Sequence, residues 1–330
     1  MDSNLIQNLI DPVILFFFFG ILAGALRSNL EIPPAIAKFL SLYLLMAIGL
    51  KGGMALAETG LSLTAVLALG GAIIMATVIP AYSFFILKGR TNPYDAAAIA
   101  ATYGSISAVT FIAAQEFLTR NGVEFGGYMT VAMVLMESPA IIMAVLLATY
   151  VRSREKQATQ TASEASAPIS MKAVMHEAFT DGAHLLLIGS LAIGFIAGDA
   201  VQSMAPFTMD IFKGILAFFL LEMGLLVARQ LRESRGLGAF QFGFAVIMPT
   251  INATLALLLA WVMGLPKGDA YLLAILSASA SYIVVPAVVR YAIPEAKPGQ
   301  YFTMSLGFTF PFNIIIGIPL YFAITSALWG

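Results

Sequence analysis

The chain consists mainly of apolar runs that are long enough to cross a lipid bilayer. Of its 330 residues, 60% are hydrophobic and only 11% are charged, whereas soluble domains are about 25% charged. The mean hydropathy is +0.91. A hydrocarbon layer about 30 Å thick requires about 20 apolar residues per helix. Because lipid cannot satisfy free backbone N–H and C=O groups, the sequence predicts an all-α integral membrane protein.

Charged residues and clusters of Pro and Gly divide these runs into ten predicted spans. The first five are 9–26, 34–50, 64–87, 94–118 and 127–150, and the second five are 183–201, 208–228, 238–263, 268–292 and 299–325. Residues 152–181 lie between the two groups and are rich in Ser, Thr, Ala and charge. This composition is typical of a flexible linker. We therefore expect two five-helix units, residues 1–151 and residues 182–330.

The two groups of five spans resemble each other in sequence. DAAAIAATYGSIS at 95–107 and DAYLLAILSASAS at 269–281 are identical at five of thirteen positions. GxxxG motifs at 20–24 and 194–198 also correspond, and we expect them to mark close helix packing. Because each repeat has an odd number of spans, the second copy must cross the membrane in the opposite direction. Inverted repeats of this kind are typical of secondary transporters that work by alternating access.

The distribution of Lys and Arg predicts the orientation in the membrane. If the N-terminus is outside, thirteen of the seventeen basic residues fall on the inner side and four on the outer side. Basic residues accumulate on the cytoplasmic side of membrane proteins. We therefore expect both termini outside and the linker 152–181 in the cytoplasm. The first ten residues contain no Lys or Arg, so the first apolar run is interpreted as a permanent span and not as a signal peptide.

The fourth and ninth spans are interrupted near their centres by small polar residues. Residues 102–107 read TYGSIS and residues 277–282 read SASASY. Gly and Ser weaken helices, and non-helical backbone at membrane depth is tolerated only where protein or a watery cavity satisfies it. Close helix packing is the alternative explanation for a single cluster. Because the cluster occurs in both repeats, we predict two broken helices that cross at mid-membrane.

The second halves of these broken helices are expected to form an anion site. Inverted topology points their two N-termini at each other, and each N-terminus carries free N–H groups and about half a positive charge. Neither break contains Lys or Arg, which favours a small monovalent anion over phosphate or sulfate. The predicted anion-binding residues lie in the two breaks: Tyr103, Gly104, Ser105, Ile106, Ser107, Ala278, Ser279, Ala280 and Ser281.

The first halves end in free carbonyl groups with negative dipole ends, which suit Na⁺. Glu137 is a carboxylate within the fifth span, where ionisable residues usually have a function. A pairing of Glu137 with a neighbouring polar group is the alternative, and helix packing is equally open for the two asparagines. The sodium-binding candidates are Thr102, Thr110, Glu137, Ser277, Asn252 and Asn313. For Asp95 and Asp269, at the starts of their spans, we expect N-capping.

Composition excludes several other functions. The chain has no Cys and only two His residues, so disulfides, thiolate metal sites and cysteine nucleophiles are absent. Its net charge of −1 argues against binding to nucleic acid. No carboxylate dyad or nucleophile–base pattern predicts catalysis. We therefore expect no enzymatic activity, no cofactor and no metal other than Na⁺ as a coupling ion.

Four motifs resemble the sodium-dependent bicarbonate transporter family, the SbtA type of the cyanobacterial carbon-concentrating system. They are YGSISAVTF at 103–111, MESPAII at 136–142, SASASYIVVP at 277–286 and TFPFN at 309–313. The resemblance extends over all ten spans. It implies symport of bicarbonate with Na⁺ in a bacterial inner membrane, and an anion site that includes the four serines of the breaks.

The same resemblance implies a particular organisation. Spans three to five and eight to ten, residues 64–150 and 238–325, would form a core domain that carries both broken helices. The other spans, residues 9–50 and 183–228, would form a gate domain. The resemblance also implies a homotrimer and a cytoplasmic PII-like regulatory protein as a partner.

Three other functions remain open from the sequence. A sodium-coupled carrier of another small or organic anion, like the bile-acid symporters, and a sodium/proton antiporter both use crossed broken helices. Proton exchange would require a carboxylate in the crossing, whereas Glu137 lies on another span. A membrane sensor that binds the anion without moving it, with the linker as its output, belongs to a different class.

Overall fold

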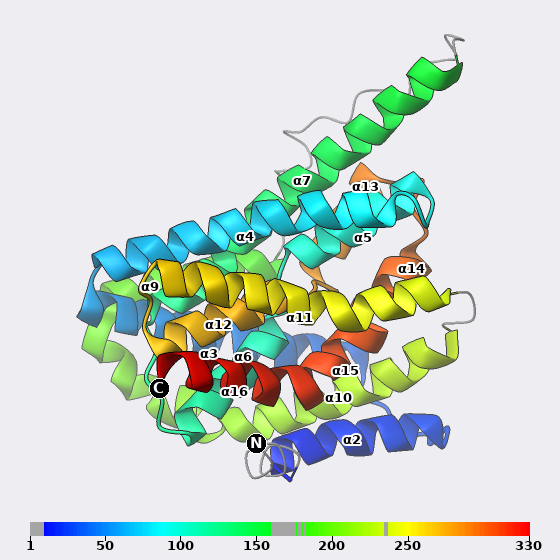
Figure 1. Cartoon of the computed structure of the whole chain (residues 1–330). Helices are drawn as coiled ribbons and strands as arrows, with labels where there is room; N and C mark the ends of the chain where they lie inside the picture. Colours follow the sequence, from blue (N-terminus) through cyan, green and yellow to red (C-terminus); the bar gives the residue numbers. More distant parts are fainter. Residues whose placement is uncertain (1–9, 160–175, 177–179, 181, 234–236) are drawn as a thin grey trace.

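The computed structural model contains helices but no strands in the described residues, 10–159, 176, 180, 182–233 and 237–330 (Figure 1). The main helices are α2 (Pro12–Ala25), α3 (Pro34–Thr59), α4 (Leu63–Leu87), α5 (Pro93–Gly104), α6 (Ala108–Arg120), α7 (Tyr128–Thr159), α9 (Gly182–Ala197), α10 (Phe212–Glu233), α11 (Ala239–Val262), α12 (Lys267–Ala278), α13 (Val284–Ala292) and α16 (Ile318–Trp329). Shorter elements are η1 (Gly198–Met204), η2 (Pro206–Asp210), α14 (Pro298–Phe302), η3 (Thr303–Thr309), α15 (Phe310–Phe312) and η4 (Asn313–Gly317).

Eight helical stretches of the described chain are long and apolar enough to cross a membrane. They include eight of the ten predicted spans. The other two predicted spans correspond to α2, which has 14 residues, and to α12 followed by α13, which are separated by a break. The prediction of an all-helical membrane protein is therefore confirmed for the described residues, with eight helices that are long and apolar enough to cross a membrane.

Two helices are longer than the sequence predicts. Helix α3 continues to Thr59 instead of ending at residue 50. Helix α7 continues to Thr159, so the first residues of the predicted linker, 152–159, are helical. Within this extension the Arg152 guanidinium donates to both Glu295 carboxylate oxygens and to the Ala292 carbonyl. The rest of the predicted linker lies outside the described residues, apart from 176 and 180.

The helices pack in two sets. Helix α3 packs along α9 and α2 packs along α10, and these are the two most extensive helix contacts. In the other set, α4 packs on α5 and α7, while α11 packs on α12 and η3. Helix α12 also contacts α4 and α6. The broken-helix segments therefore lie inside a group formed by both halves of the chain.

Glycine allows the close contacts between the paired helices. A Cβ on Gly20 would lie 2.2 Å from the Leu221 carbonyl oxygen, and one on Gly194 would lie 2.3 Å from the Leu50 carbonyl oxygen. These contacts confirm the packing role of the first glycine in each GxxxG motif. Gly198 differs: it has a positive φ and open space around it, and it begins η1 after α9 ends.

Two buried carboxylates connect the halves of the chain in equivalent ways. Asp95, in the first turn of α5, accepts a hydrogen bond of 2.7 Å from the Lys297 amide before α14. Asp269, in the first turn of α12, accepts one of 2.7 Å from the Gly126 amide before α7. The expectation that these aspartates cap their own helices is wrong. Because they are buried beside the other half of the chain, they satisfy backbone amides of that half instead.

The glycine contacts generate a prediction for stability. Gly224→Ala in α10 would place a Cβ 2.2 Å from the Phe17 carbonyl oxygen, whereas Gly214→Ala in the same helix meets no atom within 4 Å. Helix propensity alone favours alanine at both positions by about 0.5–1 kcal/mol, but overpacking costs about 1–3 kcal/mol. We expect Gly224→Ala to lower the melting temperature in detergent and Gly214→Ala to leave it unchanged or raised. Equal melting temperatures would contradict the packing of α2 on α10.

Candidate functional site

The fourth predicted span is broken between α5 and α6. Helix α5 ends at Gly104, and Ser105 and Ser107 have extended backbone conformations on either side of Ile106. Ser107 then caps α6, because its hydroxyl oxygen accepts a hydrogen bond of 3.2 Å from the Thr110 amide. A serine at an N-cap satisfies a donor that the helix itself cannot satisfy. The predicted break is confirmed.

The ninth predicted span is broken in the same way between α12 and α13. Helix α12 ends at Ala278, Ser279 is extended, and α13 begins at Val284. The Ser281 hydroxyl oxygen accepts a hydrogen bond of 3.3 Å from the Val285 amide in the first turn of α13. This break is also confirmed, and its non-helical segment, residues 279–283, is longer than the segment 105–107 in the first break.

The two breaks contact each other directly. The Ser281 amide donates to the Thr102 carbonyl at 2.8 Å, and the Ser107 amide donates to the Ser279 hydroxyl at 3.0 Å. The Ser107 hydroxyl also lies 3.3 Å from the Tyr282 hydroxyl, to which it donates. Each break therefore satisfies backbone groups that the other break has released from helical bonding.

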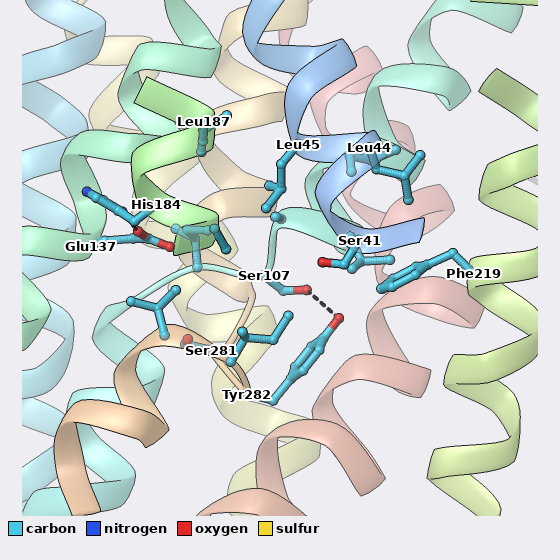
Figure 2. A pocket seen from close by; sticks show the side chains of 17 residues that line it. Ser41, Leu44, Leu45, Ser107, Glu137, His184, Leu187, Phe219, Ser281 and Tyr282 are labelled. Atoms are coloured by element: carbon cyan, nitrogen blue, oxygen red, sulfur yellow. Dashed lines mark hydrogen bonds and ion pairs between the residues drawn. The ribbon is translucent and has the colours of Figure 1, made fainter. Parts of the chain in front are cut away.

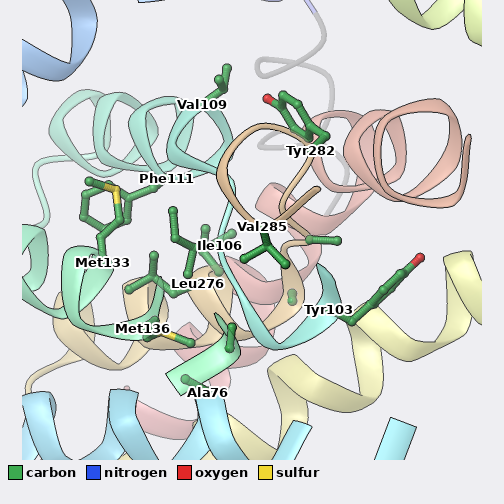
Figure 3. Close-up of a cluster of buried hydrophobic side chains, with 14 of the residues drawn as sticks. Ala76, Tyr103, Ile106, Val109, Phe111, Met133, Met136, Leu276, Tyr282 and Val285 are labelled. Carbon is green, nitrogen blue, oxygen red and sulfur yellow. The ribbon is translucent and has the colours of Figure 1, made fainter. Parts of the chain in front are cut away.

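Apolar side chains surround the crossing. Figure 3 shows Ile106, Phe111, Leu276 and Val285 packed together with methionines of α7; these four side chains are no more than 3% exposed. Gly104 approaches Pro80 of α4 so closely that a Cβ would lie 2.6 Å from the proline ring. The close packing excludes water from the crossing on this side, so the polar groups must find partners within the crossing.

A cavity lies where the second half-helices begin (Figure 2). On one side it is lined by the starts of α6 and α13, including Ser107, Ser281 and Tyr282. On the other side it is lined by α3, α9 and α10, including Ser41, Leu187 and Phe219. The cavity therefore lies between the two sets of packed helices, and both half-helix N-termini face it.

Backbone groups contribute to the electrostatics of this cavity. The first amides of a helix have no partner within that helix. In α6 the Thr110 and Phe111 amides are bonded to Ser107, and Ala108 and Val109 line the cavity. In the part of the chain that the structure describes, no Lys or Arg lines it. Two helix N-termini, each equivalent to about half a positive charge, can hold an anion of low charge here.

The predicted anion-binding residues divide into two groups. Ile106, Ser107 and Ser281 line the cavity. The others lie behind it in the crossing and are buried: Tyr103, Gly104, Ser105, Ala278, Ser279 and Ala280. Of these, Tyr103 is hydrogen-bonded through its hydroxyl to Thr309 at 2.6 Å, and Ser279 donates to the Leu276 carbonyl at 2.8 Å.

Two carbonyl groups near the C-terminal ends of α5 and α12 already accept hydrogen bonds. The Thr102 carbonyl accepts from Ser281, and the Ala278 carbonyl accepts a hydrogen bond of 2.8 Å from the Asn313 side chain. In contrast, the buried hydroxyls of Ser105 and Ser277 have no hydrogen-bond partner among the described residues. Orphaned buried hydroxyls are uncommon, and these two lie at the ends of α5 and α12.

Two of the sodium candidates take part in other interactions. Thr110 donates from its hydroxyl to Ser107 at 3.0 Å, which supports the cap of α6. Asn252 is buried in α11 and accepts a hydrogen bond from the Tyr82 hydroxyl of α4, while its amide nitrogen has no partner. Asn252 therefore connects two helices that flank the crossing.

Glu137 and His184 form a buried hydrogen-bonded pair at the edge of the cavity. Glu137 comes from α7 and His184 from α9, so the pair joins the two sets of helices. Figure 2 shows the two side chains beside each other. This contact agrees with the alternative interpretation of Glu137, in which the carboxylate pairs with a neighbouring polar group.

Sequence reasoning missed two residues that contribute to the cavity. His184 lies just inside the sixth predicted span, and the rule that ionisable residues within spans are functional could have identified it. Tyr282 directly follows the second serine cluster, and its hydroxyl contacts Ser107. A long polar side chain next to a helix break is a usable signal, but its direction depends on the turn that the break adopts.

Comparison with known proteins agrees with this geometry. A search of curated protein sequences finds no match. The sequence profile of the Na⁺-dependent bicarbonate transporter superfamily matches residues 12–326, which include both breaks and all the helices that line the cavity. The chain therefore belongs to the Na⁺-dependent bicarbonate transporter superfamily.

Proposed function

We propose that the protein is a symporter that takes up bicarbonate together with Na⁺ by alternating access. The observation that carries this proposal is the shared cavity at the N-termini of α6 and α13. Bicarbonate carries a single negative charge and several acceptor oxygens. The Ser281 and Tyr282 hydroxyls, which line the cavity beside Ser107, and the first-turn amides of the two half-helices supply donors for these oxygens. The absence of Lys and Arg from the lining suits one charge better than two.

For Na⁺ we propose a site on the opposite side of the crossing. The C-terminal ends of α5 and α12 have negative dipole ends, and the unpartnered hydroxyls of Ser105 and Ser277 lie there. Hard oxygen ligands of this kind suit Na⁺. A cation at these ends and an anion at the N-termini would stabilise each other, which provides a physical basis for coupling.

The contacts support the proposed inverted repeat. Span one packs on span seven through Gly20 and Gly224, and span six packs on span two through Gly194 and Gly49. If the two proposed repeats are exchanged, the contact between spans one and seven becomes the contact between spans six and two. The hydrogen bonds of Asp95 and Asp269 correspond in the same way. We therefore propose ten spans in two inverted repeats.

We further propose that the two sets of helices move relative to each other. The core would comprise 64–150 and 238–325, and the gate would comprise 9–50 and 183–228. The cavity between them adjoins a second one, with which it shares Ser41, Phe219 and Tyr282, and this second cavity reaches the exposed residues Lys38 and Arg290. By the distribution of basic residues, this is the cytoplasmic side.

On the opposite side, two ion pairs tie α6 to the proposed gate. Arg120 pairs with Asp11 at the start of α2, and Glu116 pairs with Lys213 of α10 at 2.6 Å. These contacts and the path toward Lys38 support an inward-open conformation. The homotrimer, the PII-like partner and the bacterial inner membrane remain proposals that follow from the resemblance.

A sodium/proton antiporter is the second candidate. The observation that favours it is the buried Glu137–His184 pair at the cavity, because both groups can bind protons. The two functions differ in a simple assay. An antiporter would drive Na⁺ flux from a pH gradient in proteoliposomes without bicarbonate, whereas the proposed symporter would not.

The anion site can be tested at Ser107 with two variants of the same size. Asp and Asn both cap helices well, so Ser107→Asp and Ser107→Asn should retain the fold. Only the aspartate adds a negative charge to the cavity. We expect Ser107→Asn to transport labelled bicarbonate with reduced affinity and Ser107→Asp to show no uptake into proteoliposomes. Equal uptake by the two variants would contradict the proposed anion site.

The sodium site can be tested through the orphaned hydroxyls. Ser277→Ala removes one proposed ligand, whereas Ser83→Ala removes another buried hydroxyl without a partner, in α4 and outside the breaks. We expect Ser277→Ala to raise the Na⁺ concentration for half-maximal bicarbonate uptake by about tenfold, and Ser83→Ala to leave it unchanged. Uptake that is unaffected when choline replaces Na⁺ would reject the coupling itself.

The proposed outer closure can be tested with a thiol reporter. The chain has no cysteine, so Thr130→Cys introduces a single thiol in the cavity that Glu116 also lines. Glu116→Lys would repel Lys213 and should open this side, whereas Glu124→Lys makes the same charge change at an exposed loop residue. We expect faster labelling by a membrane-impermeant maleimide only with Glu116→Lys.

A double variant in which the charges of Glu116 and Lys213 are exchanged provides the control for this experiment. Glu116→Lys combined with Lys213→Glu restores opposite charges and should return labelling to the slow rate. Equal labelling rates with Glu116→Lys and Glu124→Lys would mean that the ion pair does not close this side.

A further inference from the structure

A groove between α4 and α7 lies away from the cavity and takes no part in the proposed transport. It is lined by Phe84 and Lys88 of α4, by Pro93 of α5, and by Tyr150, Arg154 and Glu155 of α7. The Phe84 and Tyr150 rings meet edge to face at 5.9 Å and form its floor. Helix α7 projects past the end of α4 beside it (Figure 1).

Both cations at this groove are available for a ligand. Lys88 lies 4.3 Å from the centre of the Phe85 ring, and Arg154 lies 5.5 Å from that of Tyr150. Within the described part of the chain, neither forms an ion pair, in contrast to Arg152, which is paired with Glu295. Glu155 accepts a hydrogen bond of 2.6 Å from Tyr94. Two cations therefore face a single, already hydrogen-bonded carboxylate.

The cations lie at the end of an apolar surface. On α7, Leu146, Tyr150 and Arg154 follow each other at four-residue spacing and so share one face. Leu146 is 52% exposed, and on α4 Phe85 is 57% exposed. In a membrane protein these side chains contact lipid chains. Along this strip, apolar side chains are followed by an aromatic ring and then by a cation. A phospholipid is complementary to this sequence, because its apolar acyl chains are followed by a charged headgroup.

We propose that this groove binds the headgroup of an anionic phospholipid, with Lys88 and Arg154 at the phosphate and the acyl chains along α4 and α7. The inner leaflet of membranes contains anionic lipid, and basic pockets between helices on that side bind lipid headgroups. By the distribution of basic residues, the groove lies on the cytoplasmic side. A bound lipid would hold the projecting part of α7 against α4.

Native mass spectrometry of the whole chain in an uncharged detergent tests this site. The probes are phosphatidylglycerol and phosphatidylcholine. The variant Lys88→Gln with Arg154→Gln removes both cations, and Arg27→Gln with Arg90→Gln removes two exposed cations of the same predicted side that do not line the groove. We expect the first variant to retain about tenfold less phosphatidylglycerol than the unchanged chain, and the second to retain the normal amount. Phosphatidylcholine should bind weakly to all three.

Two results would overturn the proposal. Equal retention of phosphatidylglycerol by both double variants would show that any surface charge suffices. Displacement of phosphatidylglycerol by millimolar inorganic phosphate would show a site for soluble phosphate instead of lipid. Melting temperatures in phosphatidylcholine show whether each variant is folded, and Lys88→Gln alone, at an exposed side chain, replaces the double variant if that one does not fold.

Discussion

The structure depends on the need to satisfy backbone groups where two helices are interrupted inside an apolar protein. An unsatisfied N–H or C=O group in such surroundings costs several kcal/mol. The two breaks avoid this cost by hydrogen-bonding to each other: the Ser281 amide donates to the Thr102 carbonyl, and the Ser107 amide donates to the Ser279 hydroxyl. The fourth and ninth predicted spans therefore stabilise each other at the point where they meet.

The surrounding helices make this arrangement rigid on one side and open on the other. Pro80 packs against Gly104, and Asn313 binds the carbonyl at the end of α12, so the carbonyl ends lie in dense protein. The N-terminal ends face the cavity beside α3, α9 and α10. The carbonyl ends of the two broken helices are therefore enclosed by protein, whereas their N-terminal ends are accessible from the cavity.

Much of the local structure could be predicted from the sequence. The serine clusters at 102–107 and 277–282 weaken helices through side-chain and backbone chemistry that acts over a few residues, and both breaks occur there. The roles of individual polar residues could not be predicted in this way. In the sequence, Asp95 and Asp269 lie where helix caps are expected, but in the structure they accept hydrogen bonds from amides in the other half of the chain. Likewise, the ion pair between Arg152 and Glu295 joins segments that are distant in the sequence, which no local pattern reveals.

The sequence by itself determined the membrane class, the helical spans and the two breaks, because hydropathy and helix propensity are properties of short segments. Only the tertiary structure decided which groups meet. It paired Glu137 with His184 across two sets of helices, left the Ser105 and Ser277 hydroxyls without partners, and brought two half-helix N-termini to one cavity. The physical reason is that hydrogen bonds and ion pairs act over a few ångströms in space, so their partners depend on how distant segments pack.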